Sequence, residues 1–433
     1  MQLLLDLVQR HKAGQPVGMY SVCSAHPLVI EAAMDVAAAH AIPVLVEATS
    51  NQVNQDGGYT GMTPADFRDF VWTIADRAGV PRAQVLLGGD HLGPNAWQHE
   101  PAAVAMAKAD ILIAQYVAAG FRKIHLDCSM SCAGDPVPLP DAIVAARAAR
   151  LCAVAEITRD ASGGEAPVYV VGTEVPVPGG AHEDLALLTV TTPAAAAATI
   201  AAHRVAFAAA GLDAAWPRVI GLVVQPGVEF DHHKVIDYRA PAAAALSRFI
   251  ESEPTLVYEA HSTDYQEPGN LAALVRDHFA ILKVGPGLTF ALRETLWALA
   301  DIEAEMLLPD FSDFKNVVLD VMAREPDYWR KYYGGAPAQA RFDQQFSLSD
   351  RIRYYWPHPA IRAAQETMLG NLARATPPLT LLSQYLPRQY EAVRAGRLRN
   401  APNDLLKEGV AYVLRQYLSA CTADAVNREL EAC

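Results

Sequence analysis

The sequence has few positive charges and no long apolar segment. It contains 35 Lys and Arg against 48 Asp and Glu, which gives a formal net charge of -13 over 433 residues. Nucleic-acid phosphates would repel such a chain, so we exclude sequence-independent nucleic-acid binding. The longest apolar runs, at 193–198 and 240–246, are rich in Ala and fall well short of the roughly 20 residues that cross a bilayer. The sequence therefore predicts no nucleic-acid partner and no membrane partner.

A secretory signal and a cysteine framework are also missing. The first six residues, MQLLLD, place an acid inside the apolar stretch and have no basic region, so they are not expected to form a signal peptide. The six cysteines are scattered, and Cys128 and Cys132 have no second thiol pair at zinc-site spacing. We therefore expect neither disulfides nor a cysteine zinc site, and we expect a cytoplasmic location.

Three common catalytic signatures are absent as well. The sequence contains no nucleophile elbow, no P-loop and no dinucleotide-binding glycine fingerprint. A sugar-phosphate kinase that holds its nucleotide in a glycine-rich phosphate loop is disfavoured for this reason.

Eight short apolar runs are present, each followed by Gly, Pro or polar residues and then by a helical pattern. This order is typical of repeated βα units, and eight parallel strands either form a doubly wound sheet or close into a barrel. The count of eight favours closure, so we predict an α/β fold with a TIM (β/α)8 barrel over residues 1–290. The eight runs are 17–25, 43–51, 85–93, 123–130, 168–175, 219–227, 255–262 and 279–287.

Helix signals fall between these runs and continue after the last one. Pro27 opens a helical pattern over 27–40, Thr63 precedes a Pro at the start of a second helix, and Thr192 precedes Pro193 in the same way. Beyond the eighth run the pattern stays helical, with aromatic and Pro interruptions. We predict that residues 291–433 form an α-helical C-terminal subdomain packed on the barrel.

Ionisable residues stand at the ends of several predicted strands, and in a barrel these ends form the active-site face. Asp90 and His91 end the third run, Glu174 ends the fifth and His261 ends the seventh. Imidazole and carboxylate groups suit Zn²⁺, Mn²⁺ or Ni²⁺, so these side chains predict a divalent metal site. The alternative for a lone histidine is a satisfied core residue.

Alternation along the strands predicts further members of the site. His125 and Asp127 share one face of their strand, and if that face points inward Asp127 joins Asp90 and Glu174 as a predicted catalytic residue. The alternative for a single buried acid is a structural ion pair, for example between Lys283 and either Glu47 or Glu259. Four polar residues near the strand ends are predicted to bind substrate: Glu47, Asn51, Ser129 and Lys283.

The segment after the eighth run has the features of an anion site. Gly285 and Gly287 flank a Pro before a helix start, which leaves backbone N–H groups free where barrels often bind phosphate. Arg293 in the first turns of that helix would strengthen the site, and Arg351 and Arg353 are further candidates. The alternative is an ordinary turn between strand and helix.

Longer blocks of sequence carry a resemblance that spans nearly the whole chain. They are SVCSAHPLV at 21–29, EATSNQVNQ at 47–55, GGDHLGPN at 88–95, GTEVPVPGG at 172–180, VQPGVEFD at 224–231, YEAHSTDYQ at 258–266 and LSDRIRYYWP at 348–357. These blocks resemble the Z-type (GatZ/KbaZ) subunit family of class II D-tagatose-1,6-bisphosphate aldolase, which includes related tagatose-6-phosphate 4-epimerases. The resemblance implies a barrel, a phosphorylated ketohexose partner and a role in tagatose and galactitol catabolism.

The resemblance also implies roles for the strand-end residues. In catalytic class II aldolases, which this chain resembles only distantly, an Asp-His pair supplies the acid/base and a zinc ligand, and Asp90 and His91 match that pair. His261 matches a later zinc histidine. The middle zinc histidine has no match, and Glu174 or Gln225 would replace it.

Two functions are compatible with the resemblance. One is a metal-dependent isomerase, a 4-epimerase that interconverts D-tagatose 6-phosphate and D-fructose 6-phosphate by retro-aldol and aldol steps, with Asp90 as general base and acid at the C4 hydroxyl. The other is a non-catalytic subunit that stabilises a separate catalytic class II aldolase chain. We favour the enzyme because a scaffold would bear the cost of buried acids without using them. A homo-oligomer is expected.

Overall fold

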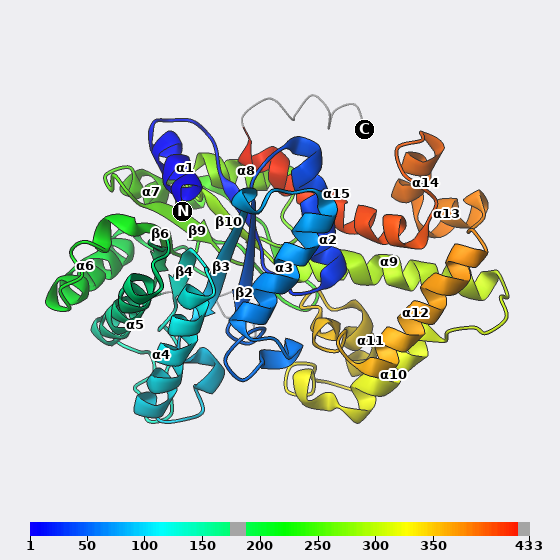
Figure 1. Ribbon diagram of the computed structural model, residues 1–433, viewed down its shortest axis with the longest axis horizontal. Helices are drawn as coiled ribbons and strands as arrows, with labels where there is room; N and C mark the ends of the chain where they lie inside the picture. Colours follow the sequence, from blue (N-terminus) through cyan, green and yellow to red (C-terminus); the bar gives the residue numbers. More distant parts are fainter. Residues whose placement is uncertain (174–187, 423–433) are drawn as a thin grey trace.

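The computed structural model describes residues 1–173 and 188–422 and contains a closed barrel of eight parallel strands (Figure 1). The strands follow the order β1-β10-β9-β6-β5-β4-β3-β2 around the barrel. They are β1 (Met19–Val22), β2 (Val44–Thr49), β3 (Val85–Leu92), β4 (Lys123–Leu126), β5 (Val168–Val171), β6 (Val219–Val223), β9 (Val257–Ala260) and β10 (Ile281–Val284). Each of the eight predicted runs contains one of these strands, so the predicted TIM barrel is confirmed.

Most strand residues are apolar because both faces of each strand are covered. Side chains fill the inside of the barrel and helices pack on the outside, so parallel strands carry nearly continuous hydrophobic sequences. Every residue of β3 is buried, including the polar pair Asp90 and His91 at its end. The register of β2 on β3 runs from Val44 opposite Val85 to Thr49 opposite Asp90, which places these strand ends side by side.

The N-terminal helix α1 (Gln2–Lys12) closes the end of the barrel at which the strands begin. Its Leu4 and Leu7 pack with residues from the strand starts, such as Val168 and Val257, in a separate hydrophobic cluster. This apolar plug leaves the opposite end of the barrel for polar side chains.

Helices follow the strands as the predicted βα units require. Thr63 caps α3 through a reciprocal capping box with Asp66, and the Thr192 hydroxyl accepts a hydrogen bond from the first turn of α6. The predicted helix over 27–40 is confirmed as α2. The helices are α2 (Pro27–His40), α3 (Pro64–Ala78), α4 (Ala102–Ala118), α5 (Asp141–Ser162), α6 (Pro193–Ala209), α7 (Ala240–Ile250), α8 (Pro268–Arg276) and α9 (Pro286–Glu305).

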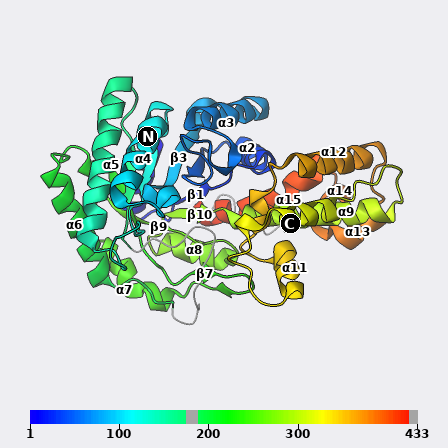
Figure 2. The same ribbon diagram turned by 90° about the horizontal axis from the view of Figure 1, so that it is seen from below.

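The C-terminal region is helical, as predicted, and α10 to α14 project to one side of the barrel (Figures 1 and 2). The last helix, α15, returns to pack against α2, α8 and α9 on the outside of the barrel. The boundary predicted at residue 290 falls within α9 and stays a prediction. The helices are α10 (Phe314–Arg324), α11 (Pro337–Phe346), α12 (Pro359–Arg374), α13 (Leu379–Tyr385), α14 (Pro387–Arg394) and α15 (Pro402–Cys421).

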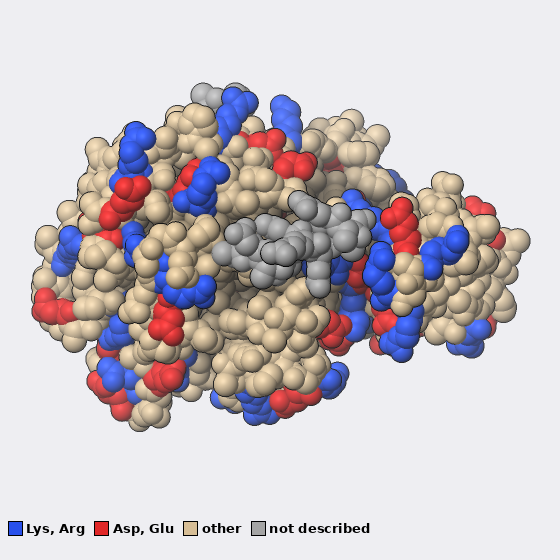
Figure 3. All heavy atoms as spheres, turned by 90° about the horizontal axis from the view of Figure 1, so that it is seen from above, with Lys and Arg blue, Asp and Glu red and all other residues tan. Residues whose placement is uncertain are grey.

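Charged side chains of both signs lie on the surface, and the described cysteines are unpaired with one another. On the face shown in Figure 3, positive and negative side chains are interspersed over the surface. No helix within the described ranges is both long and apolar enough to cross a membrane. The five described cysteines, all but Cys433, are free thiols, as expected.

Candidate active site

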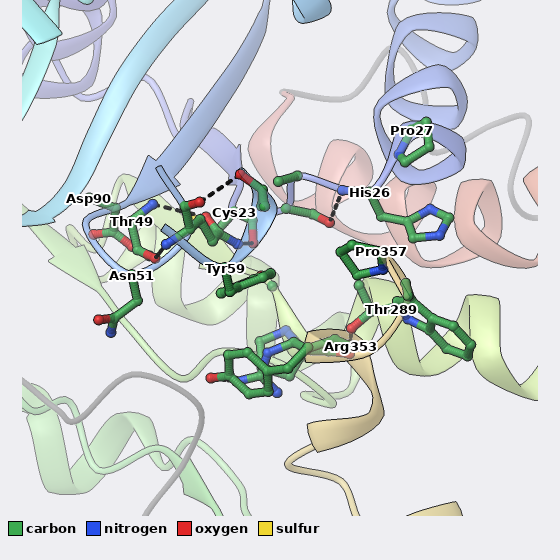
Figure 4. Close-up of a pocket in the computed structure, with 18 of the residues that line it drawn as sticks. Cys23, His26, Pro27, Thr49, Asn51, Tyr59, Asp90, Thr289, Arg353 and Pro357 are labelled. Carbon is green, nitrogen blue, oxygen red and sulfur yellow. Dashed lines mark hydrogen bonds between the residues drawn. The ribbon is translucent and has the colours of Figure 1, made fainter. Parts of the chain in front are cut away.

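A pocket of about 430 Å³ opens at the end of the barrel where the strands finish. Strand ends of the barrel supply its floor, including Asp90, His91 and Lys283, and the segment after α11 supplies much of its rim, including Arg353 and Trp356. Figure 4 shows the labelled residues converging on this space from both parts of the chain. The C-terminal region therefore completes the site that the barrel begins.

Three histidines gather at the floor of the pocket. The ring centroids of His91 and His261 lie 4.8 Å apart, and His125 lies 5.2 Å from each of them. All three side chains are buried. They come from β3, β4 and the end of β9, so closure of the barrel is what brings them together.

Four side chains at this floor have a donor set compatible with a divalent metal. Asp90, His125, Glu259 and His261 each offer one ligand atom, and these atoms all lie within 4.8 Å of one another. Within the described residues the buried Nε2 atom of His125 has no hydrogen-bond partner, a costly arrangement that a bound cation would relieve. Two imidazoles and two carboxylates suit Zn²⁺, Mn²⁺ or Ni²⁺.

His91 lies beside this donor set and is oriented by Asp127. Its Nδ1 is 2.7 Å from Oδ2 of Asp127, and its Nε2 is 3.8 Å from Oδ2 of Asp90. Ser129 donates both its backbone N–H and its hydroxyl to the other oxygen of Asp127. A carboxylate that fixes an imidazole in this way is typical of the surroundings of metal-binding histidines.

A buried network of ion pairs underlies the histidines. Lys123 Nζ lies 2.7 Å from Glu47 and 2.6 Å from Glu259, and none of the three side chains is exposed. Lys283 Nζ contacts Glu47 and lies 3.0 Å from Oδ1 of Asp90. The pairing of Lys283 with Glu47 is the structural alternative that the sequence left open. Lys283 also lines the pocket, so the same side chain connects the network to the site.

The network sets the charge of the groups in the pocket. Burial alone would raise the pKa of Asp90, but the nearby charges of His91 and Lys283 outweigh it and hold that pKa well below its usual range. Burial lowers the pKa of His261 to about 4, so this imidazole is neutral at pH 7. A carboxylate beside a neutral imidazole is the protonation state that both metal binding and proton abstraction require.

Comparisons with known proteins identify the family of this chain. The sequence profile of the family described as D-tagatose-1,6-bisphosphate aldolase subunit GatZ/KbaZ-like matches residues 4–422. The chain belongs to this family. The crystal structure of a probable tagatose 6 phosphate kinase from Sinorhizobium meliloti 1021 has 52% sequence identity and a TM-score of 0.86, over 93% of this chain and 100% of that one.

Two further aldolase structures are similar at a much lower level. Fructose-bisphosphate aldolase from Campylobacter jejuni has 15% identity and a TM-score of 0.42, over 86% of this chain and 92% of that one. The YdjI aldolase from Escherichia coli K12 has 11% identity and a TM-score of 0.39, over 85% of this chain and 97% of that one. Both similarities are too low to assign residues of the site.

Several residues predicted for the site of this GatZ/KbaZ-like chain lie in the pocket, and others do not. The predicted residues that line it include Asn51, Asp90, His91, His261, Lys283 and Gly285. Glu47, Asp127 and Ser129 are not among the lining residues and lie behind them, Glu47 against Lys283 and Asp127 between His91 and Ser129. The side-chain oxygen of Gln225 instead accepts the N–H groups of Gly227 and Val228, and Gln225 is not among the lining residues. Glu174, predicted both as a ligand and as a catalytic group, lies outside the described residues.

The predicted phosphate donors have other partners. The N–H groups of Gly285 and Gly287 donate to Oδ1 of Asp264, at 2.9 and 2.7 Å. Arg293 is buried against the ring of Phe290, 4.1 Å from its centroid, and does not line the pocket. The structure thus places a protein carboxylate at the predicted backbone site.

The two neighbouring candidate arginines have different surroundings. Arg351 stacks on the ring of Tyr332 and donates to the backbone oxygen of Tyr328, away from the lining of the pocket. Arg353 is one of the lining residues. Of the two, Arg353 is the one placed to meet a bound ligand.

The sequence prediction omitted three residues that the fold brings to the site. His125, Glu259 and Lys123 were not among the predicted ligands or substrate contacts, although alternation had placed His125 on the face of Asp127. The signal that could have found them was the same alternation: each of the three lies on an inward face next to a predicted site residue. Lys123 was the hardest to find, because a lysine at the start of a strand usually reaches solvent.

Proposed function

We propose that this chain is a metal-dependent 4-epimerase of a ketohexose 6-phosphate, interconverting D-tagatose 6-phosphate and D-fructose 6-phosphate. The observation that carries the proposal is the position of Asp90 in the pocket, 3.1 Å from His125 and 3.0 Å from the ammonium of Lys283. A buried, ionised carboxylate beside a cation and next to candidate metal ligands is in the protonation state needed to accept a hydroxyl proton.

His125, Glu259 and His261 would hold the divalent ion, with His91 at its edge. When bound, the ion supplies Lewis-acid stabilisation of the negative charge that develops on a ketose oxygen. The orphaned Nε2 atom of His125 supports this assignment. Asp127 keeps His91 in one orientation through the contact between Nδ1 and its carboxylate, so the imidazole is pre-organised.

Asp90 performs the proton transfers. It takes the proton of the C4 hydroxyl, the C3–C4 bond breaks, and the C4 carbon becomes an aldehyde while the electron pair stays on the C1–C3 fragment. After the aldehyde rotates, C3 adds to its other face, and Asp90 returns the proton to the C4 oxygen, so that atoms and charge balance. Lys283, close to Oδ1 of Asp90, stabilises the ionised carboxylate before it takes the proton and after it returns it.

The test is a direct assay of the purified chain. It is incubated with D-tagatose 6-phosphate and Zn²⁺, Mn²⁺ or Ni²⁺, and the sugars are followed by NMR. D-Fructose 6-phosphate should appear, and the Asp90→Asn variant should abolish it. Absence of product with every metal would contradict the proposal. A parallel sample with ATP examines the kinase activity that the name of the Sinorhizobium meliloti protein suggests, for which a bisphosphate would be the product.

A second candidate function is favoured by the description of the family as an aldolase subunit. In that function the chain binds and stabilises a catalytic class II aldolase chain. It predicts that a catalytic aldolase chain becomes more resistant to heat on mixing with this chain, and that the Asp90→Asn variant stabilises it equally well. Complex formation by size-exclusion chromatography, without epimerase activity, would favour this function over the first.

A further inference from the structure

The backbone site at the start of α9 is filled by the protein itself. Asp264 is buried, and its Oδ1 accepts the N–H groups of both Gly285 and Gly287. A Cβ atom added to Gly287 would lie only 3.0 Å from that oxygen, which shows how closely the carboxylate approaches the helix end. A substrate anion would have to displace a carboxylate of like charge to use these donors, so the anion needs another binding group.

Arg353 is the lining residue with the properties of such a group. Its guanidinium donates to neutral oxygens: the backbone carbonyls of Ser349 and Asp350, the latter at 3.0 Å, and the hydroxyl of Tyr354 at 2.9 Å. Within the described residues no carboxylate oxygen lies within 4.0 Å of it, and no hydrogen bond there uses its Nε. The acids Asp264 and Asp350 influence it only from a longer range.

Aromatic packing holds this guanidinium in place. It lies 4.5 Å from the ring centroid of Tyr354, and the Tyr354 ring packs edge-on against Tyr59 at 4.9 Å. A stacked arginine loses little freedom when it binds an anion, because its planar fork is already oriented. The free Nε edge is the part of the fork that pairs with two oxygens of a phosphate or carboxylate.

Arg353 lies across the pocket from Asp90. Figure 4 shows Asp90 and Thr49 on one side of the pocket and Arg353 and Thr289 on the other, with Tyr59 between them. A ligand whose reacting carbon lies at Asp90 therefore extends toward Arg353 with its far end.

We infer that Arg353 binds the terminal anionic group of the substrate, a phosphate or a carboxylate on C6, and so selects anionic over neutral ketohexoses. The inference rests on the proposed function for its choice of sugar. It assigns substrate recognition to the C-terminal region, while the barrel supplies the reacting groups.

The experiment measures binding rather than turnover. Calorimetric titrations of the full chain use D-tagatose 6-phosphate, D-tagatose, the C6-carboxylate analogue D-tagaturonate and inorganic phosphate, with wild type, Arg353→Gln and Arg353→Lys. Arg353→Gln should lower the affinity for D-tagatose 6-phosphate by on the order of a hundredfold, because the charged contact is lost. Its affinity for D-tagatose should stay within about twofold of the wild-type value. The affinity of Arg353→Lys for D-tagatose 6-phosphate should lie between those of the wild type and Arg353→Gln, since lysine keeps the charge but not the planar guanidinium.

The two anionic sugars separate the possible sources of the anion. Tighter binding of the 6-phosphate assigns a phosphate, and tighter binding of tagaturonate assigns a carboxylate. Arg324→Gln, which removes the same charge from an exposed position on α10, is the matched control and should change nothing. Circular dichroism and thermal unfolding confirm that each variant is folded.

Equal weakening of D-tagatose and D-tagatose 6-phosphate by Arg353→Gln would overturn the inference, as would no weakening of either. Different results would contradict the inferred anion site and the proposed epimerase function. If the wild type converts no sugar but binds inorganic phosphate and Arg353→Gln does not, the anion site stands and the epimerase falls. If the wild type binds neither anionic sugars nor phosphate, the anion site itself is refuted.

Discussion

Lys123 and Glu47 lie in contact beneath the pocket, with Nζ 2.7 Å from Oε1 and neither side chain exposed to solvent. Glu259 flanks the same ammonium on its other side at 2.6 Å. One buried cation thus offsets part of the charge of two carboxylates, and Lys283 offsets more. A site built in this way can keep Asp90 ionised without solvent, because the charges below it are already paired.

Replacing Lys123 by Met should strongly destabilise the fold. The substitution leaves Glu259 without its closest cation and Glu47 with Lys283 alone, and breaking a buried pair in this way typically costs about 3 to 5 kcal/mol of unfolding free energy. Urea unfolding at pH 7 measures the change. Lys108→Met is the matched control, because the pair of Lys108 with Glu100 is partly exposed and should contribute less than about 1 kcal/mol. Similar losses in the two variants would contradict the assigned burial.

Replacing Gly88 by Ala should disturb the same network by steric contact. A Cβ atom at Gly88 would lie 2.7 Å from Cγ of Glu47, closer than side chains pack. Overpacking of this kind costs about 1 to 3 kcal/mol, and we expect the epimerase activity to fall with it because Glu47 supports Lys283. Gly269→Ala is the control, since nothing lies within 4 Å of that position on α8. Unfolding curves of the two variants should diverge, and equal curves would show that Glu47 shifts freely.

The sequence predicted the barrel well because each strand carries its own signal. The run at 168–171, VYVV, is apolar at every position, and such a strand is recognisable without knowing its neighbours. The strand-end pair Asp90 and His91 was recognisable for a similar reason. These local signals are independent of how the barrel closes.

The partners across the barrel were not predictable in the same way. Lys283 and Glu47 are 236 positions apart in the chain, and their contact depends on strands β1 and β10 closing the barrel. Asp264 is 21 positions from Gly285, in a loop whose course the sequence pattern does not specify. Strand alternation offered Glu47 and Glu259 as alternative partners of Lys283 without choosing between them, and it contains no information on the contact of Asp264.

Which of the two side chains, Arg351 or Arg353, faces the pocket depends on the rotational orientation of one short helix. The two residues lie in the same turn of 3-10 helix, Arg351–Tyr354, where residues two positions apart point in different directions. Only the packing of Tyr332 and Tyr354 decides which arginine meets the pocket. The sequence could therefore propose both but not choose.

Replacing either of the histidines His125 and His261 should reduce the metal content of the protein. We expect the wild type to retain a divalent ion after dialysis, and His125→Ala and His261→Ala to bind it at least about tenfold more weakly, because each removes a donor from the set. Equilibrium dialysis with metal analysis by mass spectrometry measures this. His203→Ala is the control, since His203 is also buried and its Nε2 has no partner among the described residues, but it lies in α6, outside the donor set. Full retention of metal by both floor variants would rule out the proposed ligands.

Burial of the Glu229 carboxyl should make the stability of the protein depend on pH. Burial raises the pKa of this carboxyl from 4.5 to about 7 in the folded chain, despite its hydrogen bond from the backbone N–H of Phe230. Below pH 4.5 the group is protonated in both states, and as pH rises to 7 the unfolded chain ionises first. The folded state therefore loses stability over this window, by at most on the order of 3 kcal/mol.

Glu229→Gln should remove that loss, because glutamine keeps the shape and never ionises. The variant should match the wild type at pH 4.5 and exceed its unfolding free energy at pH 8, with the difference growing between these values. Thermal or urea unfolding at a series of pH values measures the difference, and Glu391→Gln, at an exposed position on α14, should show no such trend. A constant difference between Glu229→Gln and the wild type at every pH would mean that the carboxyl is ionised as readily in the folded chain as in the unfolded one, and that burial does not control its proton.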